Sequence, residues 1–331
     1  MTAAPFLDAY LAPLKPWLER SDVTDILVNR PGEVWVETTQ GVMTLEAAPE
    51  LSELVLGRLA RQVAAASHQG VSRERPLLSA TLSDGARVQV IAPPATRGGL
   101  VLAVRRQAIA DLSLRDLGAA GLFAASASEA ISASSDARLQ DLLSSGDLEG
   151  FLRAAVRARK SIVISGGAGA GKTTLLNALL KEIGPQERLI AIEDAPEIQL
   201  TQANAVGLVA VRGEQGEARV TAEDLLAASL RMRPDRILLG ELRGAEAFSF
   251  LRAVNSGHPG SLTTVHADSA AGALDQIALL AMTSGLDLGW EHLQTYVRRI
   301  VDVVVQVEKT ASGRRVSEIF FRPAGDVAKV S

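Results

Sequence analysis

The residues with the clearest chemical meaning form a glycine-rich loop that lies between two apolar runs. The run before it, 161–165, predicts a buried strand, and the run after it, 174–180, predicts a helix. Between them stands the pattern G-x-x-x-x-G-K-[ST], in the structural context that a phosphate-binding loop requires. Backbone N–H groups of such a loop surround phosphate oxygens, the helix N-terminus adds a partial positive charge, and the lysine reaches the β- and γ-phosphates. The predicted nucleotide-binding residues are Gly166, Gly167, Ala168, Gly169, Ala170, Gly171, Lys172, Thr173 and Thr174, and the Thr173 hydroxyl is also predicted to bind Mg²⁺.

Two carboxylates follow the next predicted strand, which begins near Arg188. Glu193 and Asp194 stand at its end, just before Pro196. Because ligands of an open parallel sheet bind at the carboxyl ends of the strands, we expect both side chains beside the phosphate loop. A carboxylate there can orient the attacking water or hold Mg²⁺ through water. The alternative interpretation is that Glu193 and Asp194 belong to a solvated acidic turn without a function, and the predicted phosphate-binding loop beside them disfavours it.

A third predicted strand, 237–239, has the form of a Walker B strand, but Gly240 and Glu241 stand where many nucleotide-hydrolysing proteins have an aspartate. Glu241 therefore competes with Glu193 for the role of base. We assign the metal side, through water, to Glu241 and the water-orienting role to Glu193. Arg243 is expected beside the Glu241 carboxylate.

Two of the four histidines, His258 and His266, lie in the segment 255–268. A metal site at these histidines is disfavoured because neither an HExxH pattern nor a third ligand is evident. His266 follows a predicted strand of the same sheet, 261–265. We therefore predict that His266 senses the γ-phosphate.

The length of 331 residues favours two domains. In about the first hundred residues, apolar residues recur at helical spacing over 6–18 and 51–65. Two short β-like runs, 26–28 and 34–36, flank a turn and predict a hairpin. Further β-like runs lie at 77–82, 87–91 and 100–104. An Ala- and Ser-rich stretch follows, and from residue 160 on apolar strands alternate with helices, as in a parallel sheet. We predict an α+β domain over 1–110, a linker over 111–149 and an α/β domain over 150–331.

Composition excludes several classes of function. The chain has no cysteine, so disulfides, cysteine-ligated metals and a catalytic thiol are excluded. Only 3 Trp, 2 Tyr and 7 Phe are present and the net charge is -4, which argues against direct nucleic-acid binding. No secretory signal is evident at the N-terminus, and no run approaches the roughly 18 apolar residues of a membrane span. We therefore expect a cytoplasmic protein whose membrane contact, if any, is peripheral.

The order of these motifs resembles the four boxes of the secretion or "traffic" ATPases: Walker A, Asp box, Walker B and His box. The segments 22–29, 32–36 and 84–87 are similar to the N-terminal domain of that family. The compact length, the absence of cysteines and the segment 29–36 look most like the VirB-type ATPases of type IV secretion and conjugation. Type IV pilus and type II secretion ATPases are the alternative, and a nucleotide-gated scaffold that does not hydrolyse is an alternative of another class.

This resemblance implies a RecA-like ATPase domain that binds ATP and Mg²⁺ between the two domains. It also implies a hexameric ring at the cytoplasmic face of the inner membrane, in contact with other subunits of the secretion apparatus. Arg87 and Arg105 match the N-terminal arginines that the family brings onto the phosphates, although each has an alternative interpretation as a surface strand residue. The long Ala/Ser stretch suggests a further hypothesis, that the N-terminal domain packs on a neighbouring subunit.

Overall fold

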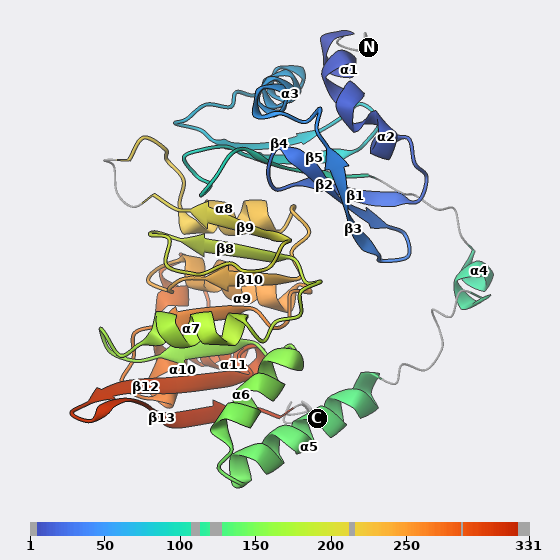
Figure 1. Ribbon diagram of the computed structural model, residues 1–331. Helices are drawn as coiled ribbons and strands as arrows, with labels where there is room; N and C mark the ends of the chain where they lie inside the picture. The colour runs from blue at the N-terminus through green and yellow to red at the C-terminus, as the bar shows by residue number, and fades with distance from the viewer. Residues whose placement is uncertain (1–4, 107–112, 120–127, 212–215, 286, 324–331) are drawn as a thin grey trace.

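The computed structural model describes residues 5–106, 113–119, 128–211, 216–285 and 287–323, which form two β-sheets with helices packed on them (Figure 1). The first sheet has six antiparallel strands in the order β3-β2-β1-β6-β5-β4. Its strands are β1 (Val23–Val28), β2 (Gly32–Thr38), β3 (Met43–Ala48), β4 (Leu77–Thr81), β5 (Arg87–Ile91) and β6 (Val101–Arg105). The predicted hairpin is confirmed, since β1 pairs with β2.

Three helices cover one face of this sheet: α1 (Pro5–Leu11), α2 (Lys15–Leu18) and α3 (Glu53–Ala66). The helical run predicted over 6–18 is interrupted by a 3-10 turn, Ala12–Leu14, and Pro13 and Pro16 explain the break because proline lacks the N–H that a continuous helix needs. In α3 the Ser52 hydroxyl caps the N-terminus by accepting the Val55 N–H.

Both faces of β1 are buried, which follows from the alternation of side chains along a strand. Ile26 and Val28 pack among the residues under the helices. Leu27 faces the other way and joins Trp35 in the core of the second sheet. The hydrophobic core is therefore continuous between the two halves of the chain.

The second sheet has seven strands in the order β13-β12-β7-β11-β10-β8-β9. All neighbours are parallel except β12 and β13, which form an antiparallel hairpin. The strand β11 lies between the strand that precedes the glycine loop, β7, and the Walker B strand, β10. The strands are β7 (Ile162–Ser165), β8 (Leu189–Glu193), β9 (Ala205–Val209), β10 (Arg236–Leu239), β11 (Leu262–Val265), β12 (Val303–Thr310) and β13 (Gly313–Phe321).

Helices cover both faces of the second sheet, so its central strands are buried along their whole length, without alternation. On one face lie α6 (Leu148–Arg157) and α7 (Lys172–Leu180). On the other face lie α8 (Ala222–Ser229), α9 (Glu246–Asn255), α10 (Ala270–Met282) and α11 (Trp290–Ile300). None of the helices among the described residues combines the length and the apolar character needed to cross a membrane.

Within the stretch predicted to be a linker, the described residues form the helices α4 (Leu114–Ala119) and α5 (Ser128–Ser144). The second of these is packed: Asp136 and Lys160 form an ion pair of 2.5 Å, and both side chains are buried. The alanine and serine composition did not distinguish this helix from a flexible linker. The ion pair holds the helix in place, and its two residues are 24 positions apart in the sequence.

The N-terminal sheet packs on the second sheet of its own chain (Figure 1). Packing of this domain on a neighbouring subunit stays a hypothesis. Residues 95–97, in the loop between β5 and β6, pair with the edge strand β9. Two arginines add polar links across the same contact: Arg188 donates to the Asn29 Oδ1 at 2.8 Å, and Arg233 donates to the Glu37 Oε2 at 2.6 Å. Burial, followed by the nearby Arg233 charge, lowers the pKa of Arg188 to about 9.

Candidate nucleotide-binding site

The glycine loop joins the end of β7 to the start of α7, as the sequence predicts. Two of its glycines are required by geometry. A Cβ at Gly166 would lie 2.3 Å from the Val307 carbonyl oxygen, and Gly171, with φ of +99°, occupies the left-handed region. Gly171 provides no side-chain cap for α7. The first amides of that helix thus remain available to an anion.

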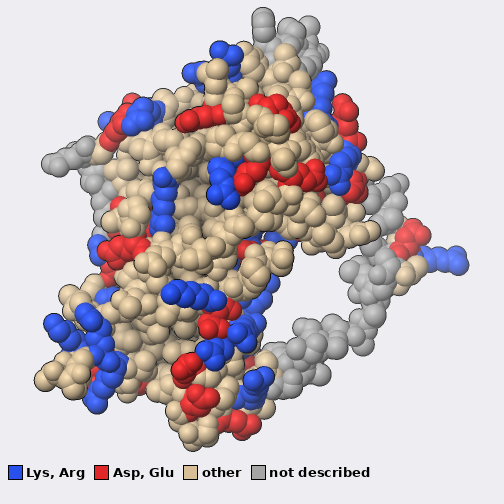
Figure 2. Space-filling model, viewed as in Figure 1, with Lys and Arg blue, Asp and Glu red and all other residues tan. Residues whose placement is uncertain are grey.

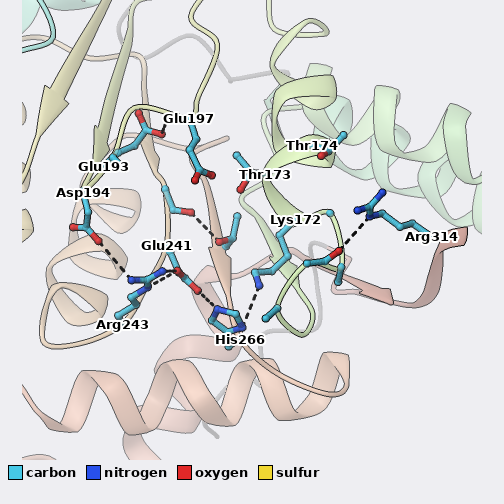
Figure 3. Close-up of a pocket in the computed structure, with 17 residues that line it drawn as sticks. Lys172, Thr173, Thr174, Glu193, Asp194, Glu197, Glu241, Arg243, His266 and Arg314 are labelled. Carbon is cyan, nitrogen blue, oxygen red and sulfur yellow. Dashed lines mark hydrogen bonds and ion pairs between the residues drawn. The ribbon is translucent and has the colours of Figure 1, made fainter. Parts of the chain in front are cut away.

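A cavity of about 550 Å³ opens over this loop (Figure 3). It is lined by the loop from Ala168 to Thr174 and by side chains from the ends of β8, β10 and β11. The structure therefore brings together four of the predicted catalytic residues, Glu193, Glu241, Arg243 and His266, with the loop. They meet because parallel strands end at one edge of the sheet. The volume falls in the range of small-molecule sites.

Lys172 lies beneath the loop, where its side chain is largely buried. Its ammonium group donates to the carbonyl oxygens of Gly166 at 2.9 Å and Gly167 at 3.2 Å. It also lies 3.2 Å from the Nδ1 of His266. Burial lowers the pKa of Lys172, and the Glu241 carboxylate opposes that effect. The ammonium is thus oriented by neutral acceptors that a phosphate can replace.

Glu241 forms the second half of the same network (Figure 3). Its Oε1 lies 2.6 Å from the Nε2 of His266, and its Oε2 accepts from the Arg243 guanidinium. His266 therefore bridges a carboxylate and the ammonium of Lys172. The Arg243 Nη1 also lies 3.9 Å from the Asp194 carboxylate. These contacts place Arg243 beside Glu241, where the sequence predicted it.

The side chain of Glu193 is enclosed by protein groups. Its side chain is 3% exposed, and its Oε1 accepts the N–H groups of Glu197 at 2.9 Å and Ile198 at 2.8 Å. Its Oε2 pairs with the Arg97 guanidinium. A Cβ at Gly240 would lie 3.0 Å from the Glu193 Cγ, which explains a glycine before Glu241. Both oxygens of Glu193 are occupied by protein groups.

Arg87 and Arg105 do not lie at this cavity. They are directly opposite each other on β5 and β6 and line a separate pocket of about 450 Å³. Arg231, in the turn before β10, lines the same pocket, together with Gln69 and Ser79. The lining of this pocket contains three guanidinium groups and no carboxylate.

Two cavity residues, Glu197 and Arg314, were not among the predicted site residues. Glu197 belongs to the acidic segment that starts at Glu193, and its carboxylate faces the loop in Figure 3, so its place in that segment was an available signal. Arg314 reaches the loop from the β12–β13 hairpin and donates through its Nε to the Gly169 carbonyl oxygen at 3.2 Å. No local pattern identifies Arg314, since its proximity arises from the pairing of β12 with β7.

The residues present fit Mg²⁺ bound together with a nucleotide. The Thr173 hydroxyl lines the cavity, and Glu241 lies across from it. Among the described residues, no group of three or more His, Asp or Glu side chains could hold a metal ion by itself. Mg²⁺ keeps several water ligands and takes others from substrate phosphates, so one hydroxyl and one carboxylate are a fitting set of protein groups for it.

The loop between β7 and α7, with carboxylates at the ends of the adjacent strands, defines the chain as a protein of the P-loop nucleotide-binding class. The protein family described as "Type II/IV secretion system protein" matches residues 8–325 of the chain. The chain therefore belongs to the type II/IV secretion system protein family. The resemblance to the VirB-type ATPases, inferred from the compact length, the absence of cysteines and the segment 29–36, is confirmed by the relatives.

The relatives are similar over nearly their whole length. The type IV secretion system protein VirB11 of Bartonella quintana (strain Toulouse) is 38% identical over 328 residues, which are 95% of this chain and 92% of the relative. PtlH of Bordetella pertussis (strain Tohama I) is 42% identical over 332 residues, with 96% and 95% covered. The crystal structure of the VirB11 ATPase of Brucella suis, in complex with sulphate, superposes with a TM-score of 0.87 at 36% identity, covering 96% of this chain and 98% of that one. This likeness confirms the mixed α/β fold.

Proposed function

We propose that this chain is an ATP-hydrolysing motor subunit that energises type IV secretion, for substrate transfer or pilus biogenesis. The observation that carries the proposal is the contact of Lys172 with His266 and of His266 with Glu241 in the cavity over the phosphate loop. The likeness to VirB11 and PtlH, both described as type IV secretion system proteins, supports the choice of machine.

Several residues of the cavity have a role in the proposed reaction. The loop amides and Lys172 bind the β- and γ-phosphates of ATP. Thr173 would hold Mg²⁺, which neutralises phosphate charge when bound. Glu241 orients the attacking water, because its side chain is 14% exposed and pairs with the half-exposed His266, whereas the side chain of Glu193 is 3% exposed. This reverses the assignment made from the sequence, in which Glu193 orients the water and Glu241 lies on the metal side.

His266 and Arg243 complete the charge balance. His266 lies between Lys172 and Glu241. When a γ-phosphate attracts the Lys172 ammonium, the imidazole loses that contact, and His266 in this way senses whether the γ-phosphate is present. Arg243 is half-exposed and already paired with Glu241, and it stabilises charge that develops on the phosphate.

Arg87 and Arg105 act, in this proposal, on the nucleotide of a neighbouring subunit. Both line a pocket without carboxylates that is separate from the phosphate-loop cavity of their own chain. In a ring, each subunit presents one surface to the next, so a pocket on one subunit can complete a site on its neighbour. The proposed assembly is a homo-hexamer in the cytoplasm, peripheral to the inner membrane, in contact with other secretion subunits.

Phosphate release by the purified full chain tests the activity. Lys172→Ala should abolish ATP turnover and leave the thermal unfolding transition in place, and Glu241→Gln should bind ATP without turning it over. His292→Ala, an exposed histidine on α11, is the matched control and should keep wild-type turnover. Wild-type turnover by Lys172→Ala would contradict the assignment. Nucleotide binding by the wild type without phosphate release would favour the gated scaffold instead.

Light scattering with and without ATP tests the ring on the same sample. The expected result is a sixfold chain mass in the presence of nucleotide. A monomer under conditions of full turnover would contradict the ring and, with it, the proposed role of Arg87 and Arg105. Fractionation of cells that carry the whole secretion apparatus tests the peripheral location: salt washes should release the protein from membranes.

A further inference from the structure

Arg97 belongs to the N-terminal half of the chain, but its guanidinium pairs with Glu193, a residue that lines the nucleotide cavity of the second half. It follows Ala95 and Thr96 in the loop between β5 and β6. The Arg97 N–H donates to the Gly207 carbonyl oxygen at 2.9 Å, and the Val209 N–H donates to the Ala95 carbonyl oxygen at 2.9 Å. These bonds add a short antiparallel segment to β9, and they fix the backbone from which the Arg97 side chain starts.

The path of the Arg97 side chain depends on a glycine. A Cβ at Gly207 would lie 2.4 Å from the Arg97 Cδ, so the observed path of the side chain across β9 passes over a residue without a Cβ. Beyond Gly207 the guanidinium pairs with the Glu193 Oε2 and donates through Nη1 to the Ile198 carbonyl oxygen at 2.7 Å. The arginine therefore contacts both ends of the segment 193–198.

That segment forms one wall of the nucleotide cavity. The Glu193 carboxylate stabilises this segment by accepting the N–H groups of Glu197 and Ile198. Two other carboxylates of the segment, Asp194 and Glu197, line the cavity. A carboxylate that is 3% exposed needs an opposite charge, because burial of an unpaired ion is costly. Among the ion pairs of the described residues, the one that reaches Glu193 comes from Arg97.

We propose that Arg97 is a positioning residue for the nucleotide-site loop 194–198, acting through Glu193, so that the loop is held in its working geometry only while the N-terminal domain is docked on β9. The proposal rests on the ATPase function proposed above and adds the route by which a movement of the N-terminal domain changes turnover. No contact between Arg97 and the nucleotide is required. A displacement of the loop by about 1 Å is enough to cost on the order of a hundredfold in rate.

The test compares Arg97→Gln and Arg97→Lys with Arg30→Gln, a matched arginine of the same groove that pairs with Glu33 instead. Steady-state phosphate release should give a kcat at least about tenfold lower for Arg97→Gln, with KM within about twofold of wild type. Arg97→Lys should recover part of the loss, because it keeps the charge opposite Glu193. Arg30→Gln should match the wild type.

A double-mutant cycle separates positioning from domain attachment. In a Glu193→Gln background, Arg97→Gln should cause little further loss, since no carboxylate remains to be positioned. If Arg97 only attaches the domain, the two losses multiply, and that result would overturn the proposal. A wild-type kcat for Arg97→Gln would overturn it as well.

Hydrogen exchange of the peptide 193–199 keeps the proposal testable if the chain does not hydrolyse ATP at all. Arg97→Gln should speed exchange of the Glu197 and Ile198 amides about tenfold, while Arg30→Gln leaves it unchanged. Failure of the proposed function is seen in the wild type, which then releases no phosphate. Failure of the Arg97 proposal is seen as unchanged exchange in the variant, whatever the wild type does.

Discussion

The Nε2 of His266 lies 2.6 Å from the Oε1 of Glu241, and its other ring nitrogen lies 3.2 Å from the ammonium of Lys172. One imidazole thus connects the carboxylate of one strand end to the lysine of the phosphate loop. His258, the other histidine of the same box, instead contacts the Ala253 carbonyl oxygen at 2.9 Å at the end of α9. The two histidines therefore have different tasks, and His266 is the one that belongs to the site.

Replacing His266 should impair turnover rather than binding. His266→Ala is expected to lower kcat by about a hundredfold, roughly 2.7 kcal/mol, because it removes the group that holds the Glu241 carboxylate beside the γ-phosphate. ADP affinity, measured by calorimetry, should change little, since the loop amides remain. A large loss of ADP affinity with unchanged kcat would contradict the proposed role.

Arg87 and Arg105 allow a direct test of action between subunits. Neither Arg105→Ala nor Lys172→Ala alone should turn over ATP. Co-expressed in equal amounts, they should recover activity at about a quarter of the sites, because one site in four then combines an intact loop with an intact neighbouring arginine. Phosphate release by the mixed rings is the measurement. No recovery above the separate variants would place Arg105 in its own chain's site.

Arg314 should contribute to nucleotide binding from the β12–β13 hairpin. It donates to the Gly169 carbonyl oxygen at 3.2 Å, and positive side chains gather over the end of this hairpin in Figure 2. Arg314→Ala is expected to weaken ADP binding about fivefold, roughly 1 kcal/mol. Arg315→Ala is the control, since Arg315 pairs with Glu308 and does not line the cavity. Equal effects of the two variants would indicate a general charge effect.

Asp25 should make the protein less stable at neutral pH than its asparagine variant. It is 3% exposed, and burial raises its pKa against the opposing charge of Arg105, which lies opposite it on β6. A raised pKa means that the folded state favours the protonated form, so the stabilising contribution is present in acid and is lost as the pH rises through that pKa. Asp25→Asn should therefore raise the melting temperature near pH 7, and the gain should vanish as the pH falls toward 3.8.

Asp22 provides a control of opposite sign for this experiment. It is exposed, and the Arg20 guanidinium lowers its pKa. Its contribution to stability is present above its ordinary pKa and is lost as the pH falls, so Asp22→Asn should lower the neutral-pH melting temperature slightly or not at all. Identical shifts for Asp22→Asn and Asp25→Asn would contradict the assignment of the Asp25 effect to burial.

The sequence predicted the features that depend on local patterns. The glycine loop, Glu241 and His266 were found because each follows an apolar strand, and a parallel sheet brings such strand ends together. β3 was missed, since most of its residues are not buried and it reads as a mixture of Ala, Glu and Thr without a clear strand pattern. The positions of Arg97 and Arg314 could not be predicted, because each reaches the site through pairing between segments that are far apart in the sequence.

The pairing of residues 95–97 with β9 also protects the second sheet from self-association. The two edge strands of that sheet differ: β13 carries exposed Arg314, Arg315 and Glu318, which discourage pairing with another chain, whereas β9 is Ala205-Val-Gly-Leu-Val209 and carries no charge. The N-terminal domain covers the uncharged edge. A fragment that begins after residue 106 would leave β9 open as a template for further strands, and such a fragment should aggregate where the full chain does not.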